Sequence, residues 1–144
     1  MKHFFPEILF PEAAGRTKLP LLLSEVAAGF PSPADDYIDK KMDLNEQLIS
    51  NKAATFLMRA YGDSMHDANI REGDILVVDR SMDSRNNSII IAVVNGELTV
   101  KRIRQQDGRL YLIPENPDYS PLEITAETSF EIWGVVTYII HKAV

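Results

Sequence analysis

Residues 89–101 of this 144-residue chain read IIIAVVNGELTVK and carry the strongest indication of its fold. An apolar run ends at Asn95-Gly96, the pair that two-residue β-hairpin turns favour because both turn positions take positive φ. A second strand-like run, 97–104, follows at once. The stretch therefore predicts an antiparallel hairpin with Lys101 on its second strand.

The rest of the chain from residue 54 onward shows the same pattern of short apolar runs and turns. Asp107-Gly108 marks a second hairpin of the same kind. One short helix is expected over 43–50, because Asp43 and Glu46 have capping-box spacing, and Asn51 is expected to close it. Closely spaced hairpins with so little helix predict a mostly β, antiparallel domain. The expected strands are 54–61, 74–79, 88–94, 97–104, 109–113 and 130–141.

The composition bounds what the chain can do. A hydrophobic content of 45% supports a single core, and the net charge of −6 argues against a direct grip on nucleic acid. The absence of cysteine excludes disulfides, thiolate metal sites and a cysteine nucleophile. No apolar run approaches the length of a membrane span. The scattered histidines show no metal-ligand spacing, and no phosphate-binding or dinucleotide fingerprint is present.

Ser64 stands at the point where the apolar run 55–61 ends in Gly62-Asp63. A serine at a sharp turn after a strand holds its hydroxyl clear of the sheet, but it needs a base to act as a nucleophile at neutral pH. The histidines at positions 3, 66 and 141 have no convincing acidic partner in the local sequence, and His66 is too close along the chain to reach the hydroxyl easily. Lys101 is the stronger candidate base.

A lysine acts as a base only when its amine is uncharged, and burial lowers the pKa of such an amine. The period of a strand places Lys101 on the same face as Thr99, which would be able to orient the amine, and puts Arg102 and Arg104 on the other face. Simpler interpretations stay open at this stage. Gly-Asp-Ser is ordinary turn or N-cap sequence, and Lys101 has the pattern of a surface lysine in a basic strand.

The N-terminal third has little regular pattern. Residues 1–18 are expected to form an irregular arm, and 19–23 to lie extended on an apolar surface. A secretory signal is not expected, because acidic residues at positions 7 and 12 interrupt a basic leader. The segment 30–33, Phe-Pro-Ser-Pro, must be extended because each proline excludes helix at the residue before it. Such a segment suits either a peptidase groove or a plain linker.

Six segments, in order and at characteristic spacing over about residues 19–140, resemble the LexA/UmuD family of self-cleaving serine peptidases. The resemblance is closer to the UmuD branch, because no DNA-binding domain precedes the matching part of this sequence. The segments are AGFPSPADDY at 28–37, GDSM at 62–65, GDILVVD at 73–79, TVK at 99–101, PENPDYSP at 114–121 and GVV at 134–136.

The resemblance implies a strongly bent antiparallel β domain of the LexA/UmuD C-terminal type, preceded by a flexible N-terminal arm. It implies Ser64 as the nucleophile and Lys101 as the general base, with no cofactor and no metal. The bond that is cut would join Ala28 to Gly29. Residues 1–28 would then be the arm that self-cleavage removes, and residues 29–144 the peptidase-like domain.

The resemblance also implies a cytoplasmic homodimer of the SOS response. Contact with a RecA–single-stranded DNA filament would stimulate self-cleavage. The trimmed form would join a UmuC-type Y-family polymerase in error-prone translesion synthesis, with the replication clamp as a further partner.

Two alternatives remain at this stage. One is a noncatalytic dimeric adaptor that binds a polymerase or clamp, against which the presence of both Ser64 and Lys101 argues. The other is a signal-peptidase-like enzyme acting on other proteins, which the lack of a membrane anchor weakens.

Overall fold

A computed structural model describes residues 18–22, 26, 28–29 and 38–144. The described residues fall into two compact units, one ending at Ser50 and the other spanning Asn51–Val144. Each unit has its own pairing of strands. The expected arm 1–17 and the proline-flanked segment 30–33 lie outside the described residues.

The first unit contains a strand pair and a short helix. Strands β1 (Lys18–Leu22) and β2 (Ile38–Asp43) pair antiparallel, and helix α1 (Leu44–Leu48) follows directly. The Asp43 side chain accepts a hydrogen bond from the backbone N–H of Asn45 at 2.9 Å, so the predicted cap is confirmed. The helix ends earlier than expected. Asn51 does not close it but instead caps the 3₁₀ turn η1 (Lys52–Ala54), accepting from Ala53 N–H.

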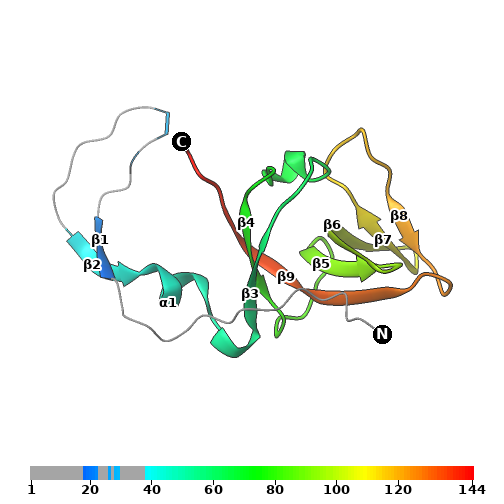
Figure 1. The fold of residues 1–144 in the computed structure, drawn as a ribbon, viewed down its shortest axis with the longest axis horizontal. Coiled ribbons are helices and arrows are strands. Elements are labelled where there is room, and N and C mark those ends of the chain that lie inside the picture. Colours follow the sequence, from blue (N-terminus) through cyan, green and yellow to red (C-terminus); the bar gives the residue numbers. More distant parts are fainter. Residues whose placement is uncertain (1–17, 23–25, 27, 30–37) are drawn as a thin grey trace. The chain divides into compact units, whose positions relative to one another are not determined.

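The second unit is one sheet of seven antiparallel strands, which confirms the predicted fold class (Figure 1). The order across the sheet is β3-β4-β9-β5-β6-β7-β8. A 3₁₀ turn, η2 (His66–Ala68), lies between β3 and β4. The strands are β3 (Thr55–Arg59), β4 (Ile75–Asp79), β5 (Ile89–Val94), β6 (Glu97–Gln106), β7 (Arg109–Ile113), β8 (Leu122–Ile124) and β9 (Phe130–Ile140).

Both predicted hairpins are present. Asn95 and Gly96 have φ of 49° and 84°, and Asp107 and Gly108 have φ of 53° and 73°. Positive φ at both central positions is the turn geometry that matches the twist of paired strands. The first of these turns fixes the register of β5 on β6, in which Ile90 lies opposite Lys101, and the second joins β6 to β7.

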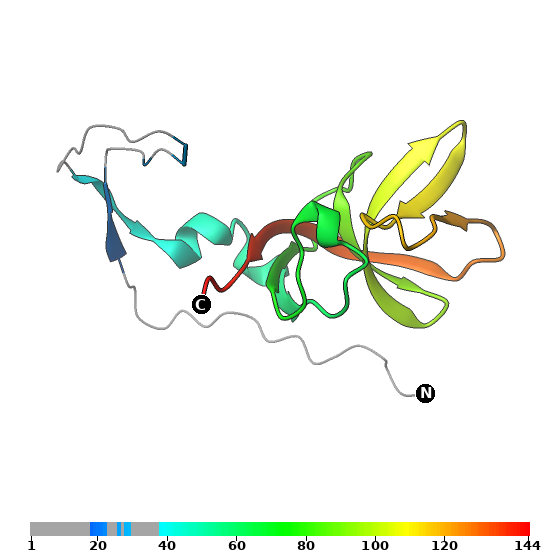
Figure 2. The same cartoon turned by 90° about the horizontal axis from the view of Figure 1, so that it is seen from above.

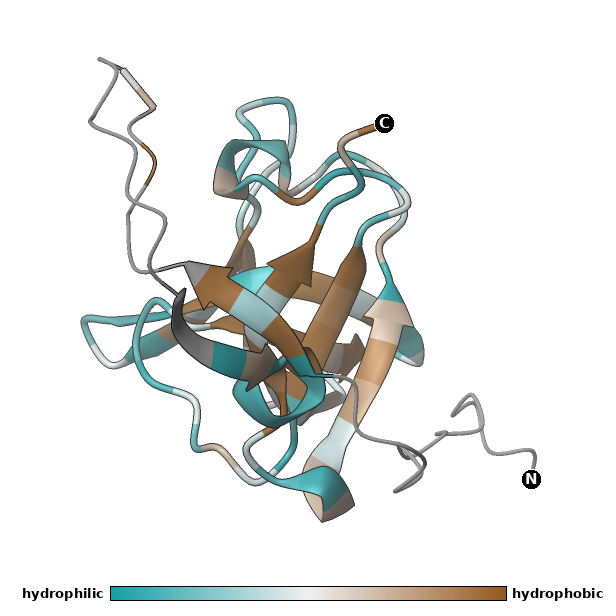
Figure 3. Ribbon diagram, turned by 90° about the vertical axis from the view of Figure 1, so that its left-hand side faces the viewer, coloured by the Kyte–Doolittle hydropathy of each residue, from teal (hydrophilic) through white to brown (hydrophobic). Residues whose placement is uncertain are grey.

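Strand β5 is buried on both faces, which explains its uninterrupted apolar sequence. Ile91 packs into one core cluster with Phe56 and Trp133, whereas Ile90 packs into a second cluster with Leu112. In Figure 3, the strands of the second unit are mainly hydrophobic and the loops that connect them are mainly hydrophilic. The sheet therefore has apolar side chains packed on both of its faces.

Strand β9 bends the sheet between these two clusters. Its C-terminal half pairs with β4 and its N-terminal half with β5, and the register shifts once in each pairing. Such bulges bend a strand and increase its twist. Figure 2 shows β9, in orange to red, as the long strand that spans the sheet. The bend depends on Gly134, because a Cβ there would lie 2.7 Å from Val78 Cγ1 and 2.9 Å from the Asp79 carbonyl oxygen.

We expect Gly134→Ala to destabilise the second unit by about 1–3 kcal/mol, because the added methyl meets backbone that cannot move away alone. Chemical denaturation followed by tryptophan fluorescence measures this, since Trp133 is buried in the same strand. Gly29→Ala is the matched control, because no atom lies within 4 Å of a Cβ built there. Equal stability of the two variants would contradict the packing argument.

Candidate functional site

Ser64 lies on a loop that runs from the end of β3 to η2, residues 62–69, here called the serine loop. Gly62 has φ of +81°, which turns the chain sharply away from the strand. The next anchor is Met65, whose side chain is 1% exposed in the core. Between these two constraints Ser64 is held partly buried with its hydroxyl in a cleft.

Lys101 reaches this hydroxyl from β6. Its Nζ donates to Ser64 Oγ at 2.9 Å, to Thr99 Oγ1 at 2.9 Å and to the Val100 carbonyl oxygen at 3.1 Å. The expected contact between Thr99 and the amine is therefore present. Three acceptors at hydrogen-bond distance fix the position of a side chain that otherwise has four rotatable bonds.

The sheet topology explains how residues on nonadjacent strands meet. Strand β7 pairs with β6 only over Arg102–Gln106, so in the described sheet the edge of β6 before Arg102 is not covered by β7. The serine loop approaches β6 at that edge. The cleft there has a volume of about 260 Å³ and is lined by the end of β3 and the start of β6: Met58–Tyr61, Ser64, Leu76, Ile91 and Leu98–Lys101.

Burial lowers the pKa of the Lys101 amine below its ordinary value. No carboxylate lines the cleft among the described residues, and the one other charged side chain there is Arg59. Desolvation therefore acts without an opposing negative charge. A larger share of the amine is uncharged near neutral pH than for a hydrated lysine, which is the state that can accept a proton from a hydroxyl.

A second loop, residues 114–119, holds the serine loop in place, and sequence analysis missed this role. Asn116 Nδ2 donates to the Asp63 carbonyl oxygen at 2.9 Å, and the Tyr119 hydroxyl donates to Asp63 Oδ1. The Asp63 side chain thus accepts a hydrogen bond from a residue of another loop. The sequence gives no signal of this contact, because its partners are more than 50 residues apart.

The candidate histidines have partners other than Ser64 and Lys101. His66 is exposed, and its Nδ1 is 3.5 Å from Asp67 Oδ1. His141 Nδ1 lies 2.7 Å from Oδ1 of the buried Asp74, a partner that the local sequence did not reveal. Ala28 and Gly29 are exposed and belong to the first unit.

Two negative findings apply to the described residues only. No group of three or more His, Cys, Asp or Glu side chains there is placed to hold a metal ion. No helix within the described ranges is long and apolar enough to span a membrane.

An antiparallel β domain with a serine hydroxyl against a partly buried lysine amine has the arrangement of serine peptidases that use lysine as their base. Residues 20–137 match the Peptidase S24-like family. This match covers most of the chain, which therefore belongs to that family. The resemblance to the self-cleaving LexA/UmuD serine peptidases is confirmed.

Several curated proteins are similar to this chain over most of its length. The chain is 45% identical to the protein SamA of Salmonella typhimurium over 123 residues, which is 85% of each protein. It is 40% identical to the protein MucA of Escherichia coli over 131 residues, covering 88% of this chain and 89% of MucA. It is also 37% identical to the LexA repressor of Bordetella petrii over 130 residues, but these span only 57% of that repressor.

The lowered pKa of Lys101 makes stability depend on pH with a definite sign. Between the folded-state pKa and the unfolded value of about 10.4, the unfolded chain binds the extra proton, so stability rises with pH. Replacing Lys101 by Met removes this dependence. We expect the gain in unfolding free energy from Lys101→Met to be largest near neutral pH. This gain should shrink as pH rises, because the lysine form itself becomes more stable.

Urea denaturation at several pH values, in a Ser64→Ala background, measures the effect. Lys52→Met is the matched control, because Lys52 is exposed. If the stability difference for Lys101→Met were as flat with pH as that of the control, Lys101 would not be desolvated.

Proposed function

We propose that this UmuD-type protein cleaves its own Ala28–Gly29 bond by a Ser64–Lys101 dyad and thereby acts in SOS mutagenesis. The observation that carries the proposal is the 2.9 Å contact between Ser64 Oγ and Lys101 Nζ in an open cleft. Membership of the Peptidase S24-like family and similarity to SamA and MucA support it.

The chemistry follows from the two groups. Neutral Lys101 takes the hydroxyl proton as Ser64 Oγ attacks the carbonyl carbon of Ala28. Backbone N–H groups of the serine loop stabilise the negative charge that develops on the carbonyl oxygen. The C–N bond then breaks, and the ammonium of Lys101 returns the proton to the amine of Gly29. Water, deprotonated by Lys101 in turn, hydrolyses the resulting ester and regenerates Ser64.

The cleft has the shape that an extended segment requires. One side is formed by the start of β6, whose backbone can pair with an added strand. A second cleft of about 310 Å³ continues past Lys101, between Leu98, Leu112 and Leu122. The small side chain of Ala28 suits close approach to Ser64, and the apolar residues after Gly29 suit the continuation of the groove.

A slow resting state follows from two requirements that must coincide. The cleavage segment must enter the cleft, and Lys101 must lose its proton. A partner that stabilises the docked segment raises the rate by shifting this population. We assign that role to the RecA–single-stranded DNA filament. The net charge of −6 favours contact with a protein rather than with DNA itself.

We further propose that the protein is a cytoplasmic homodimer whose trimmed form, residues 29–144, associates with a UmuC-type Y-family polymerase. Contact with the replication clamp would place this complex at stalled DNA synthesis. These assignments rest on the family and on the similarity to UmuD-type proteins.

Purified protein at about pH 10 should slowly release a fragment that begins at Gly29, because alkaline conditions deprotonate lysine. The rate should climb with pH and level off below the pH at which a hydrated lysine titrates, as the lowered pKa requires. Intact-mass measurement and N-terminal sequencing of the products test this.

Ser64→Ala is expected to abolish cleavage, and Lys101→Ala to slow it by about 10²–10⁴-fold. Lys101→Arg is the matched control, since arginine keeps a positive charge but does not lose its proton in this range. Unchanged mass of the unmodified protein after long alkaline incubation would instead favour a noncatalytic adaptor.

RecA filaments formed on single-stranded DNA should accelerate cleavage at neutral pH, and the Ser64→Ala protein should remain intact in their presence. Sedimentation should show a dimer. Filaments without effect on the rate would contradict the trigger, and a monomer throughout the accessible concentrations would contradict the dimer.

A further inference from the structure

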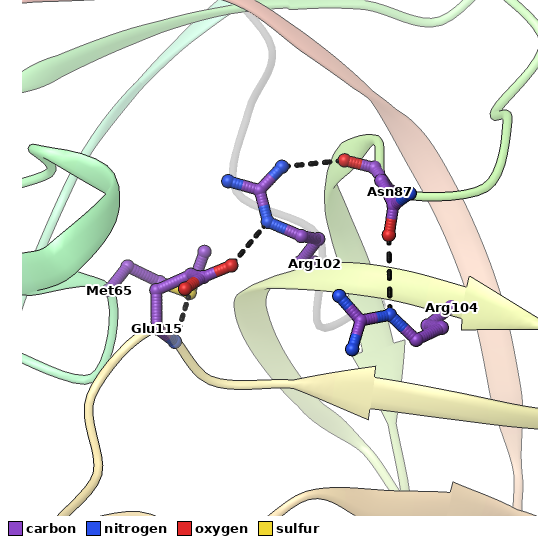
Figure 4. Close-up of polar contacts among 5 residues, drawn as sticks. All are labelled: Met65, Asn87, Arg102, Arg104 and Glu115. Carbon is purple, nitrogen blue, oxygen red and sulfur yellow. Dashed lines mark hydrogen bonds and ion pairs between the residues drawn. The ribbon is translucent and has the colours of Figure 1, made fainter.

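A set of contacts separate from the Ser64–Lys101 pair joins the same two elements on which these residues lie. Arg102 follows Lys101 on β6, and its Nε donates to Glu115 Oε1 at 2.5 Å. The backbone N–H of Glu115 lies 3.4 Å from Sδ of Met65, and its carbonyl oxygen accepts from Asp67 N–H at 2.8 Å. Figure 4 shows Glu115 between Arg102 and Met65. One residue therefore contacts both β6 and the serine loop.

The ion pair is partly shielded from water. The side chains of Arg102 and Glu115 are 25% and 29% exposed. Arg102 is also fixed from its other end, where Nη1 donates to the Asn87 carbonyl oxygen at 2.6 Å. A half-buried, charge-assisted pair with a second anchor is stronger than a surface ion pair, which contributes little.

Neither side chain reaches the reacting atoms. Strand alternation directs Arg102 to the face of β6 opposite Lys101, and Glu115 contacts the residue after Ser64 rather than Ser64 itself. We propose that Arg102 and Glu115 are positioning residues for the Ser64–Lys101 dyad, holding the serine loop against β6 so that the hydroxyl stays at bonding distance from the amine. This inference rests on the proposed function.

The physical reason is that the contact between Ser64 and Lys101 alone does not keep the two side chains in position. Lysine has a long flexible side chain, and the serine loop approaches β6 along the edge that β7 leaves unpaired before Arg102. A displacement of about 1 Å at reacting atoms can cost roughly 10²-fold in rate. Movement of the loop away from β6 would also admit water to the amine and favour its charged form.

Given the charged and titratable groups around Lys101, Arg102 and Glu115 affect its amine mainly through the position of the serine loop. Arg59, at the end of β3, and Tyr61, two residues further on, line the cleft, and Glu97 lines the adjoining cleft from the start of β6. Arg102 and Glu115 line neither cleft, so they act on the amine by placing the serine loop over it.

The test is the pH–rate profile of self-cleavage for Arg102→Gln, Glu115→Gln and the double variant. We expect each single variant to cleave roughly tenfold more slowly at neutral pH, with a lower alkaline plateau because the hydroxyl is displaced and a profile moved to higher pH because water reaches the amine. The double variant should be no slower than either single variant, because both remove the same contact.

Arg104→Gln is the matched control. Arg104 lies two residues further along the same face of β6, and its Nε donates to Asn87 Oδ1 at 3.2 Å rather than to Glu115 (Figure 4). Its pH–rate profile should be unchanged. A profile displaced equally in the control, or an undisplaced profile in both the Arg102 and the Glu115 variants, would overturn the proposal.

A readout independent of cleavage separates this proposal from the proposed function. In a Ser64→Ala background, NMR titration of the Lys101 side chain should show its midpoint moving to higher pH with Glu115→Gln, although loss of a negative charge alone would move it to lower pH, and not with Arg104→Gln. If the unmodified protein does not cleave, the proposed function fails, and this titration still decides the positioning role. A Lys101 titration that is unmoved, or moved to lower pH, in the Glu115 variant would overturn it.

Discussion

The contact between the Lys101 amine and the Ser64 hydroxyl is the constraint to which the surrounding structure is fitted. Three oxygen atoms lie within hydrogen-bond distance of the amine, Ser64 Oγ among them, and partial burial lowers its pKa. A charged lysine would be more stable in water than in this cleft. The fold therefore has to provide the packing that keeps the amine there, and most of its particular features serve that need.

Two features of the sheet bring the pair together. Strand β9 bends between its pairings with β4 and β5, and Gly134 allows the close approach that the bend requires. Strand β7 stops short of the first half of β6, which leaves an edge for the serine loop to approach. The loop 114–119 then holds the serine loop in place through hydrogen bonds with Asp63, Met65 and Asp67. Geometry at the site thus depends on strand lengths as much as on the two reacting residues.

Local sequence patterns predicted the elements whose conformation is determined by a few neighbouring residues. The two hairpins were predicted because Asn-Gly and Asp-Gly suit positive φ, and both form. Strands β2 and β8 were not predicted: β2 is rich in charged residues and β8 is short, so neither has a clear apolar period. The helix at 44–48 is shorter than its cap suggested, because Asn51 begins a new turn.

The candidate site was predictable only in part. Strand alternation placed Lys101 with Thr99, and the family motifs singled out Ser64, yet their catalytic roles remain predictions. The contacts of Asp63 with Tyr119 and of Arg102 with Glu115 depend on tertiary structure, because each joins segments separated in sequence. Partners of this kind leave no mark in a local pattern.

The most direct test is to compare two curves for the unmodified site: the pH dependence of self-cleavage, and the titration of the Lys101 amine by NMR in the Ser64→Ala protein. If neutral Lys101 is the base, the rate should rise over the same pH range in which the amine loses its proton, below the ordinary range for lysine. A rate that rises where Lys101 does not titrate would contradict the account.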